Sequence, residues 1–287
     1  MKILITSLLA VTCVQAFAGD KIIYGADDRQ DIRDVSDAAL LELAASTAAM
    51  IPNWKVGYYT DKVVIPAIND ILSLESSMGV CATERFASQP ALADCSGFLV
   101  GEKTLITAGH CVNEAQGCGD NVWVFDYKLD TPGVDTPMVR NSNIYKCAKV
   151  VKSVLDPVTK MDYAVVELDR AVPDRKPLAF RKTGTVEVDT PLIVIGHPSG
   201  LPTKVAGGAR VMDINPVFFR GNLDTYGGNS GSAVFNASTL EVEGILVRGA
   251  RDYVASPAGC AVSNVIADAR PTEAVTLITN VKEISGL

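Results

Sequence analysis

The glycine-rich sequence GGNSGS at residues 227–232 places Ser230 between glycines on both sides. The glycines around it favour a tight turn whose backbone N–H groups can converge on one point. A serine hydroxyl is a weak nucleophile, and it needs a neighbouring base whose tautomer is fixed by a carboxylate. If this turn carries chemistry, the rest of the sequence must supply that base and that carboxylate.

The chain has only two histidines, His110 and His197. His110 belongs to TAGHC at 107–111, which follows a β-rich run, and Asp162 opens the apolar sequence DYAVVEL at 162–168. We interpret His197 as a surface or packed histidine of a turn. Two histidines are too few for a metal site built on several imidazoles, so no metal is expected.

Together these segments predict a catalytic triad in which Ser230 is the nucleophile, His110 the base and Asp162 the carboxylate that orients it. The N–H groups of Gly228 and Ser230 would form the oxyanion hole. Each segment alone also has a structural interpretation, as a packed histidine, a strand-start cap or a plain turn. Their combination in a chain with so few histidines favours catalysis.

The order of these residues along the chain is histidine, aspartate, serine, which matches the chymotrypsin-like arrangement. An α/β-hydrolase would need a histidine after its nucleophile, and none follows Ser230. The G-x-S-x-G elbow also fails, because Ser232 replaces its last glycine. A subtilisin-like enzyme could use an aspartate before His110, but its serine motif is absent.

Short β-rich runs follow one another from about residue 95, separated by turn residues, as expected for an all-β barrel or sandwich. They cover residues 98–100, 104–107, 122–125, 148–154, 164–168, 192–195, 233–235 and 243–247. Residues 37–51 are rich in alanine and leucine and could form a helix, although a strand through 46–48 is the alternative. The proline-containing stretch at 170–184 is the best candidate for a linker.

The quoted motifs resemble those of the trypsin-like serine endopeptidases. Similarity to their bacterial V8-type glutamyl endopeptidase branch extends to IIYGADDR at 22–29, CSGFLVGEKTLITAGHC at 95–111 and IGHPSG at 195–200. The resemblance implies the chymotrypsin-like fold, two antiparallel β-barrels with the active site in the cleft between them. His110 and Asp162 would then come from the first barrel and Ser230 from the second.

The resulting domain prediction has five parts. A signal peptide covers 1–18 and a short propeptide 19–21. An N-terminal segment and the first barrel occupy 22–172, a linker 173–185, and the second barrel with the C-terminal segment 186–287.

The first eighteen residues have the features of a secretory signal: Lys2, an apolar stretch over 3–14, and an A-x-A cleavage site at 16–18. A membrane anchor is disfavoured because polar residues interrupt the stretch and leave it too short to span a bilayer. We therefore expect a secreted protein, extracellular or periplasmic, with no membrane span. The net charge is −7, without a basic run, which disfavours nucleic acid as a partner.

The six cysteines that follow the signal favour disulfides over zinc, because no C-x-x-C pair is present. They are Cys81, Cys95, Cys111, Cys118, Cys147 and Cys260. The family resemblance implies a bond between Cys95 and Cys111. The other four cysteines allow three pairings, among which the sequence does not choose.

Lys21, followed by Ile22 and Ile23, resembles the activation junction of a zymogen. In the animal trypsin branch the freed amine pairs with an aspartate just before the nucleophile. Asn229 occupies that position here, so this salt bridge cannot form. The V8-type resemblance implies instead that the new terminus lies near the substrate pocket. The alternative is that Lys21 is an ordinary exposed residue.

The resemblance also implies a substrate-binding site that includes Asp224, Thr225 and Gly249. Asp224 lies six residues before the nucleophile, where a carboxylate would bind a basic side chain. Two nearby arginines, Arg248 and Arg251, could neutralise it, and an ordinary loop aspartate remains the alternative.

We therefore predict a serine endopeptidase that cleaves through an acyl-enzyme, with a preference for Lys or Arg, and without a metal or cofactor. Glutamyl specificity is the main alternative, weakened because Leu246 stands where the V8-type branch has a histidine. A non-catalytic binding module and an esterase on the same scaffold are the others. Protein or peptide substrates are the expected partners, and we expect a monomer.

Overall fold

The computed structural model describes residues 23–57, 72–112, 119–267 and 270–287. The predicted signal peptide, the propeptide at 19–21 and the Lys21–Ile22 bond lie outside these residues. Within the described part of the chain, no helix combines the length and apolar character needed to cross a membrane.

The first barrel is a closed ring of six antiparallel strands in the order β3-β4-β5-β8-β7-β6, closed by pairing of β6 with β3. Its strands are β3 (Thr47–Pro52), β4 (Cys95–Leu99), β5 (Thr104–Thr107), β6 (Asn121–Phe125), β7 (Ile144–Leu155) and β8 (Asp162–Leu168). Large apolar side chains such as Leu105, Trp123 and Phe125 fill its interior and are at most 1% exposed. This burial is what closes the sheet around a core.

The second barrel also has six strands, in the order β10-β11-β17-β13-β12-β9, and it closes because β10 pairs with both β9 and β11. The strands are β9 (Pro191–Gly196), β10 (Lys204–Ile214), β11 (Phe218–Gly221), β12 (Ala233–Asn236), β13 (Val242–Arg248) and β17 (Glu273–Leu277). A short strand from the N-terminal segment, β2 (Arg29–Asp31), adds to β10 from outside the ring. Residues far earlier in the chain therefore brace the second barrel.

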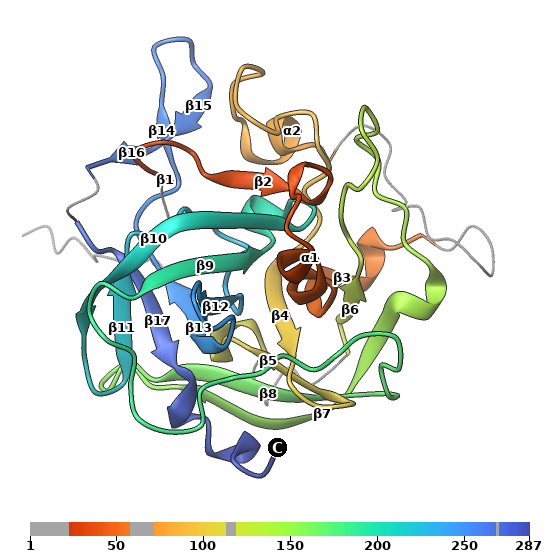
Figure 1. Ribbon diagram of the computed structural model, residues 1–287. Helices are drawn as coiled ribbons and strands as arrows, with labels where there is room; N and C mark the ends of the chain where they lie inside the picture. Colours follow the sequence, from red (N-terminus) through yellow and green to blue (C-terminus); the bar gives the residue numbers. More distant parts are fainter. Residues whose placement is uncertain (1–22, 58–71, 113–118, 268–269) are drawn as a thin grey trace, which may run out of the picture.

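The two barrels lie side by side (Figure 1), and one apolar cluster spans both of them. Phe98 and Ile106 enter that cluster from the first barrel, and Ile195 and Ile245 enter it from the second, all fully buried. The shared core fixes the position of each barrel against the other, which is the condition for a site assembled from both.

Two short α-helices stand outside the barrels, α1 (Ala38–Ala45) and α2 (Leu74–Met78). Asp37 caps α1 by accepting from the Ala39 N–H, and Ser73 caps α2 by accepting from the Ser76 N–H. The segment at 37–51 thus contains both candidate structures, a helix and then β3. Single 3₁₀ turns cover Ile32–Asp34, Asn53–Lys55, Gly109–Cys111, Asn141–Asn143, Pro198–Gly200, Ile278–Asn280 and Lys282–Ile284.

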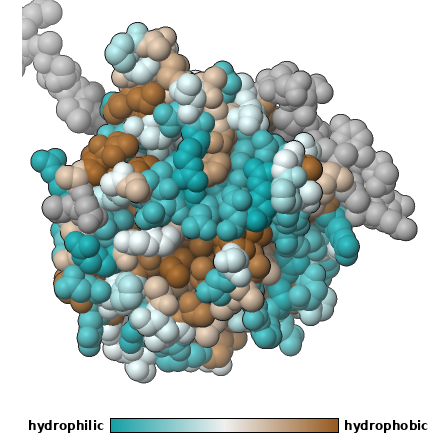
Figure 2. All heavy atoms as spheres, turned by 45° about the horizontal axis from the view of Figure 1, so that its top comes forward, coloured by the Kyte–Doolittle hydropathy of each residue, from teal (hydrophilic) through white to brown (hydrophobic). Residues whose placement is uncertain are grey.

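Two small pairs of strands complete the fold. β1 (Ile23–Tyr24) runs parallel to β16 (Val265–Ile266), and β14 (Tyr253–Ala255) forms a hairpin with β15 (Ala261–Ser263). At the top of Figure 1 this hairpin stands beside α2, and a disulfide joins Cys81, in the segment after α2, to Cys260 between β14 and β15. On the face shown in Figure 2, hydrophilic residues predominate and hydrophobic residues gather in separate patches between them.

The all-β, two-barrel expectation is confirmed, and the run at 104–107 coincides with β5. β7 extends four residues before and one residue after its predicted run at 148–154, and it begins with the buried Ile144 and Tyr145. No strand was predicted at the positions of β10, β11 or β17. Glycines and charged residues interrupt the β pattern of β10, and β11 and β17 lie among turn residues.

Candidate active site

His110 and Asp162 meet at the edge of the first barrel. β5 and β8 are antiparallel neighbours, so the turn that follows β5 lies beside the first residue of β8. His110 Nδ1 is 2.9 Å from Asp162 Oδ2, and the backbone N–H of His110 donates to Asp162 Oδ1 at 3.2 Å. The His110 ring is partly exposed and Asp162 is 2% exposed. A carboxylate on Nδ1 fixes the tautomer that leaves Nε2 free to accept a proton.

Asp162 is also surrounded by groups of the second barrel. Thr276 donates its hydroxyl to the Asp162 carbonyl at 2.9 Å, and Arg248 Nη1 is 3.7 Å from Asp162 Oδ2. Arg248 Nη2 donates to the carbonyl of Lys160 at 3.1 Å. Burial lowers the pKa of Arg248, and the charge of Asp162 acts in the opposite direction. Arg248, one of the two arginines that could neutralise Asp224, instead directs its guanidinium to the carboxylate next to His110.

Ser230 lies in the turn between β11 and β12, where it is buried. The Ser96 N–H on β4 donates to the Ser230 carbonyl at 2.8 Å, and the Leu246 carbonyl accepts from the Gly231 N–H at 2.7 Å. Gly231 has φ +88°, and a Cβ there would overlap the Ser96 carbonyl oxygen. Only glycine fits this position, so the turn is held against the first barrel by close backbone contact.

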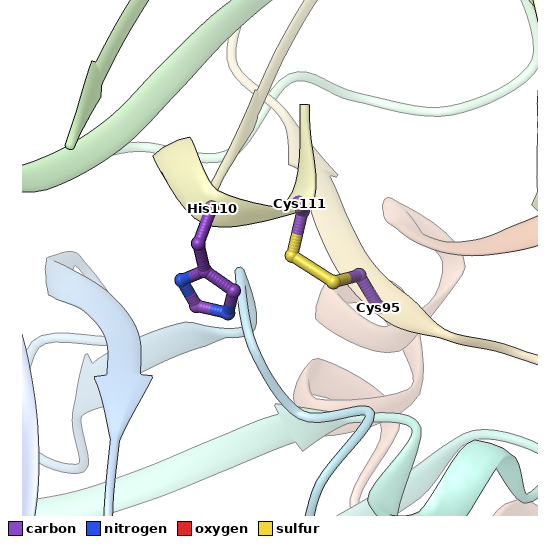
Figure 3. Close-up of side chains that lie close together, drawn as sticks. All are labelled: Cys95, His110 and Cys111. Atoms are coloured by element: carbon purple, nitrogen blue, oxygen red, sulfur yellow. A yellow bond between two sulfur atoms is a disulfide. The ribbon is translucent and has the colours of Figure 1, made fainter. Parts of the chain in front are cut away.

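A disulfide lies beside His110 (Figure 3). It joins Cys95 on β4 to Cys111, whose sulfur is 3.7 Å from the Ser230 carbonyl oxygen. The ligand atoms of Cys95, His110 and Cys111 lie within 4.8 Å of one another, but both sulfurs are consumed in the disulfide and offer no thiolate to a metal. The bond instead ties the segment around His110 to the strand that holds the serine turn.

The structure also shows how most of the other cysteines are bonded. The structure contains the Cys95–Cys111 bond that the resemblance implies, and it pairs Cys81 with Cys260. Cys147 is also disulfide-bonded. Cys118 lies outside the described residues.

The two candidate oxyanion donors, at Gly228 and Ser230, belong to the same tight turn. Gly228 has φ +88°, and a Cβ there would lie 2.7 Å from the Gly200 nitrogen and would overlap the His197 carbonyl oxygen. The turn at 227–230 therefore packs directly on the 3₁₀ turn Pro198–Gly200.

His197 is fully buried at the start of that 3₁₀ turn. Its Nδ1 bonds the Leu201 carbonyl at 3.0 Å, and its Nε2 has no hydrogen-bond partner among the described residues. Burial lowers the pKa of His197 to about 3. A neutral, enclosed imidazole of this kind is a packing element of the turn, so His110 is the candidate base of the two histidines.

Asp224 is 4% exposed, and both of its oxygens are directed to the N-terminal segment. Oδ1 accepts from the Tyr24 N–H at 2.7 Å and Oδ2 accepts from the Asp28 N–H at 2.9 Å. Burial raises the pKa of Asp224 to about 6. The carboxylate expected to bind substrate thus anchors residues 24–28 beneath the serine turn.

A second carboxylate, Glu273 at the start of β17, was missed by the sequence analysis. It is fully buried, accepts from the Thr225 hydroxyl, and accepts from the Ala250 N–H at 3.2 Å. A Cβ on Gly249 would overlap its carboxylate. Two of the predicted substrate-binding residues, Thr225 and Gly249, therefore converge on Glu273. An acidic residue opening the otherwise apolar run EAVTL was the available signal.

Comparison with known proteins identifies the family of the chain. The profile of the trypsin-like peptidase domain matches residues 95–245, more than half of the chain. The chain is 29% identical over 150 residues to a glutamyl endopeptidase of Staphylococcus epidermidis, covering 49% of each chain. It is 24% identical over 156 residues to a glutamyl endopeptidase of Bacillus licheniformis, covering 52% of this chain and 47% of that one.

The chain spans about half the length of the curated relatives it matches. Among solved structures, a Glu endopeptidase in complex with MPD superposes with a TM-score of 0.52 at 15% identity, covering 90% of this chain and 94% of that one. The VesB protease of Vibrio cholerae superposes with a TM-score of 0.53 at 13% identity, covering 92% and 66%. At these identities the structural matches establish the fold.

Proposed function

The chain belongs to the trypsin-like peptidase family, and from that membership we propose that it is a serine endopeptidase that cleaves through an acyl-enzyme. The observation that carries the proposal is the contact of 2.9 Å between His110 Nδ1 and Asp162 Oδ2, beside a serine in a glycine turn. Such a pair makes the opposite ring nitrogen a base toward a serine hydroxyl.

The proposed reaction has two halves. Ser230 Oγ attacks the scissile carbonyl while His110 takes its proton, and His110 then returns that proton to the leaving amine. Water, activated by the same imidazole, hydrolyses the ester that remains on Ser230. Asp162 keeps the imidazole oriented and stabilises its charged form, and the N–H groups of Gly228 and Ser230 stabilise the oxyanion. No step in this sequence uses a metal or a cofactor.

We propose that cleavage follows Lys or Arg, because a buried carboxylate, Glu273, lies under Gly249. A negative group at the base of a pocket attracts a basic side chain and repels an acidic one. Glutamyl specificity is the second candidate, favoured by the names of the matched relatives. Leu246, fully buried on β13, offers no charge or donor to an acidic side chain, which supports the first candidate.

We propose secretion, on the signal-like first eighteen residues and on two disulfides, which persist in oxidising compartments. Protein or peptide substrates are the proposed partners, and the enzyme is proposed to act as a monomer.

If the Lys21–Ile22 bond is cleaved, the new N-terminus is Ile22, which directly precedes β1 and the segment that Asp224 anchors. The N-terminal segment would then complete the substrate site.

The proposal is tested by digestion of a peptide library with the wild type and with the Ser230→Ala variant, read by mass spectrometry. We expect the variant to lose turnover by about 10⁴–10⁶-fold while its circular dichroism and melting temperature stay unchanged. Cleavage by that variant at the wild-type rate would show that Ser230 is not the nucleophile. A folded wild type that neither cleaves peptides nor esters would instead support the non-catalytic binding module.

A further inference from the structure

The Gly227–Gly228 peptide needs a fixed orientation for the proposed oxyanion hole to exist. One of the two donors is the Gly228 N–H, and in a trans peptide the N–H points opposite to the preceding C=O. Rotation of this one peptide would place the Gly227 carbonyl oxygen where the donor should be, and two consecutive glycines offer little steric resistance to such a rotation. In the trypsin branch an ion pair at the residue before the nucleophile accompanies activation, but Asn229 provides no carboxylate for it.

Gly227 is held from both sides in this structure. Its carbonyl accepts from the Ser199 N–H at 2.5 Å, and its own N–H donates to Asp252 Oδ2 at 2.8 Å. The first bond turns the Gly228 N–H away from Ser199. The second prevents Gly227 from rotating about its own backbone without losing a hydrogen bond to a charged acceptor, the stronger kind.

The two holding groups are themselves connected. Tyr253, the residue after Asp252, places its hydroxyl 2.7 Å from Ser199 Oγ, and its ring lies 4.9 Å from the ring of Tyr226. Ser199 is in the left-handed region with φ 53°, a conformation that a side chain adopts at some cost. The contact with Tyr253 therefore offsets the strain that brings the Ser199 N–H to the Gly227 carbonyl.

The next peptide is bound by the first barrel. The Ser96 hydroxyl donates to the Gly228 carbonyl at 2.8 Å and accepts from the His197 N–H at 3.0 Å. The peptides on both sides of the proposed donor are thus fixed by neighbours from β4, from the 3₁₀ turn at 198–200 and from the start of the β14–β15 hairpin.

We propose that Asp252, acting with Ser199, is a positioning residue that sets the Gly227–Gly228 peptide in its oxyanion-binding orientation. This inference rests on the proposed function. It assigns to the base of the β14–β15 hairpin the orienting role that an activation ion pair has in the trypsin branch. It predicts that the acceptor at position 252 acts on the transition state much more than on substrate binding.

The test compares Asp252→Ala and Asp252→Leu, which remove the acceptor, with Asp252→Asn, whose amide oxygen can still accept from the Gly227 N–H. We expect kcat to fall about 10–100-fold in the first two, since loss of a whole oxyanion donor costs roughly 10²–10³-fold. KM should change less than about threefold, and Asp252→Asn should recover most of the activity.

Binding of a peptide aldehyde, which forms a tetrahedral adduct, should weaken in proportion to kcat, whereas binding of the matching product peptide should stay unchanged. A merely structural role would move both affinities together. The matched control is Glu84→Ala, because Glu84 accepts from Ser263 on the same hairpin at 2.6 Å without touching Gly227. We expect that control to keep kcat within about twofold.

The outcomes separate the two proposals. An inactive wild type contradicts the proposed function. An active wild type whose Asp252→Ala and Asp252→Leu variants keep their kcat, or lose it equally with Asp252→Asn, overturns only the inference on Asp252. If Asp252→Ala does not fold, the comparison of Asp252→Leu with Asp252→Asn decides.

Discussion

At the scale of single residues, two buried carboxylates lie near the serine turn and have different neighbours. Asp224 accepts backbone N–H groups of the N-terminal segment, whereas Glu273 faces Thr225 and Gly249. The family resemblance pointed to Asp224, because this residue lies six positions before Ser230. Glu273 is 43 residues beyond the nucleophile and reaches the site only because β17 pairs with β13.

We therefore predict that Glu273→Gln lowers kcat/KM for Lys and Arg substrates by about 100-fold, because a buried charge partner is lost. Asp224→Asn should affect this preference much less and should mainly destabilise the protein. Rates on a matched set of Lys, Arg, Glu and Ala peptides measure both effects. The assignment fails if Asp224→Asn abolishes the basic preference while Glu273→Gln retains it.

His197 gives a second residue-scale prediction, on acid stability. Because burial lowers its pKa to about 3, the unfolded chain binds a proton between pH 6.5 and 3 that the folded protein does not bind. The free energy of unfolding therefore falls as the pH drops through this window. Lys204, which also disfavours the charged ring, adds to the effect.

Between pH 6.5 and 4 we expect the wild type to lose about 2–3 kcal/mol more than His197→Asn, whose amide can still donate to the Leu201 carbonyl. Urea unfolding at several pH values measures the difference. Parallel pH dependences of the two proteins would show that His197 does not titrate in this way.

At the scale of elements, the N-terminal segment stabilises the serine turn through Arg29 on β2. Arg29 is 2% exposed, pairs with Asp27 at 2.8 Å, and stacks its guanidinium 4.3 Å from the centre of the Tyr226 ring. Tyr226 directly precedes the Gly227–Gly228 peptide. A strand that is far from the serine in sequence thus supports the turn that carries it.

Replacing Arg29 by Met should lower the free energy of unfolding by about 3 kcal/mol, because it leaves Asp27 without its buried partner and removes the ring contact. Lys176→Met is the control. Lys176 pairs with Glu42 at 2.5 Å on the surface, where an ion pair contributes little, so the free energy of unfolding should stay nearly unchanged. Equal losses in the two variants would refute this role of β2.

At the scale of the whole molecule, the shared apolar cluster makes the two barrels one folding unit. Ile106 from the first barrel and Ile245 from the second are both fully buried in it. Truncation of either side chain to alanine should cost about 2–5 kcal/mol and should preserve a single cooperative transition. Calorimetry that resolves separate transitions for the barrels would contradict this prediction.

The fold and the candidate triad could be predicted from the sequence because short local motifs indicate both of them. A short pattern of glycine, β-branched or apolar residues marks each of three segments: the turn of Ser230, the sequence around His110 and the strand that begins at Asp162. Their chain order then selects one architecture.

The rest of the site could not be predicted in this way. Glu273, Asp252 and Ser199 acquire their positions from strand pairing, a hairpin and a positive φ. The acidic residue that opens the run EAVTL marks Glu273 as unusual, but no residue pattern shows which part of the site it faces. The contact of Arg248 with Asp162 was unpredictable for the same reason, since only the packing of β13 on the first barrel brings the two together.

The most direct test of the proposed function is the intact mass of the protein after exposure to a fluorophosphonate, followed by peptide mapping. We predict one adduct per chain, located on Ser230, formed rapidly in the wild type and absent from Ser230→Ala. His110→Ala should slow its formation by several orders of magnitude because the serine loses its base. A folded wild type that forms no adduct, or a Ser230→Ala variant that forms one equally well, would contradict the account.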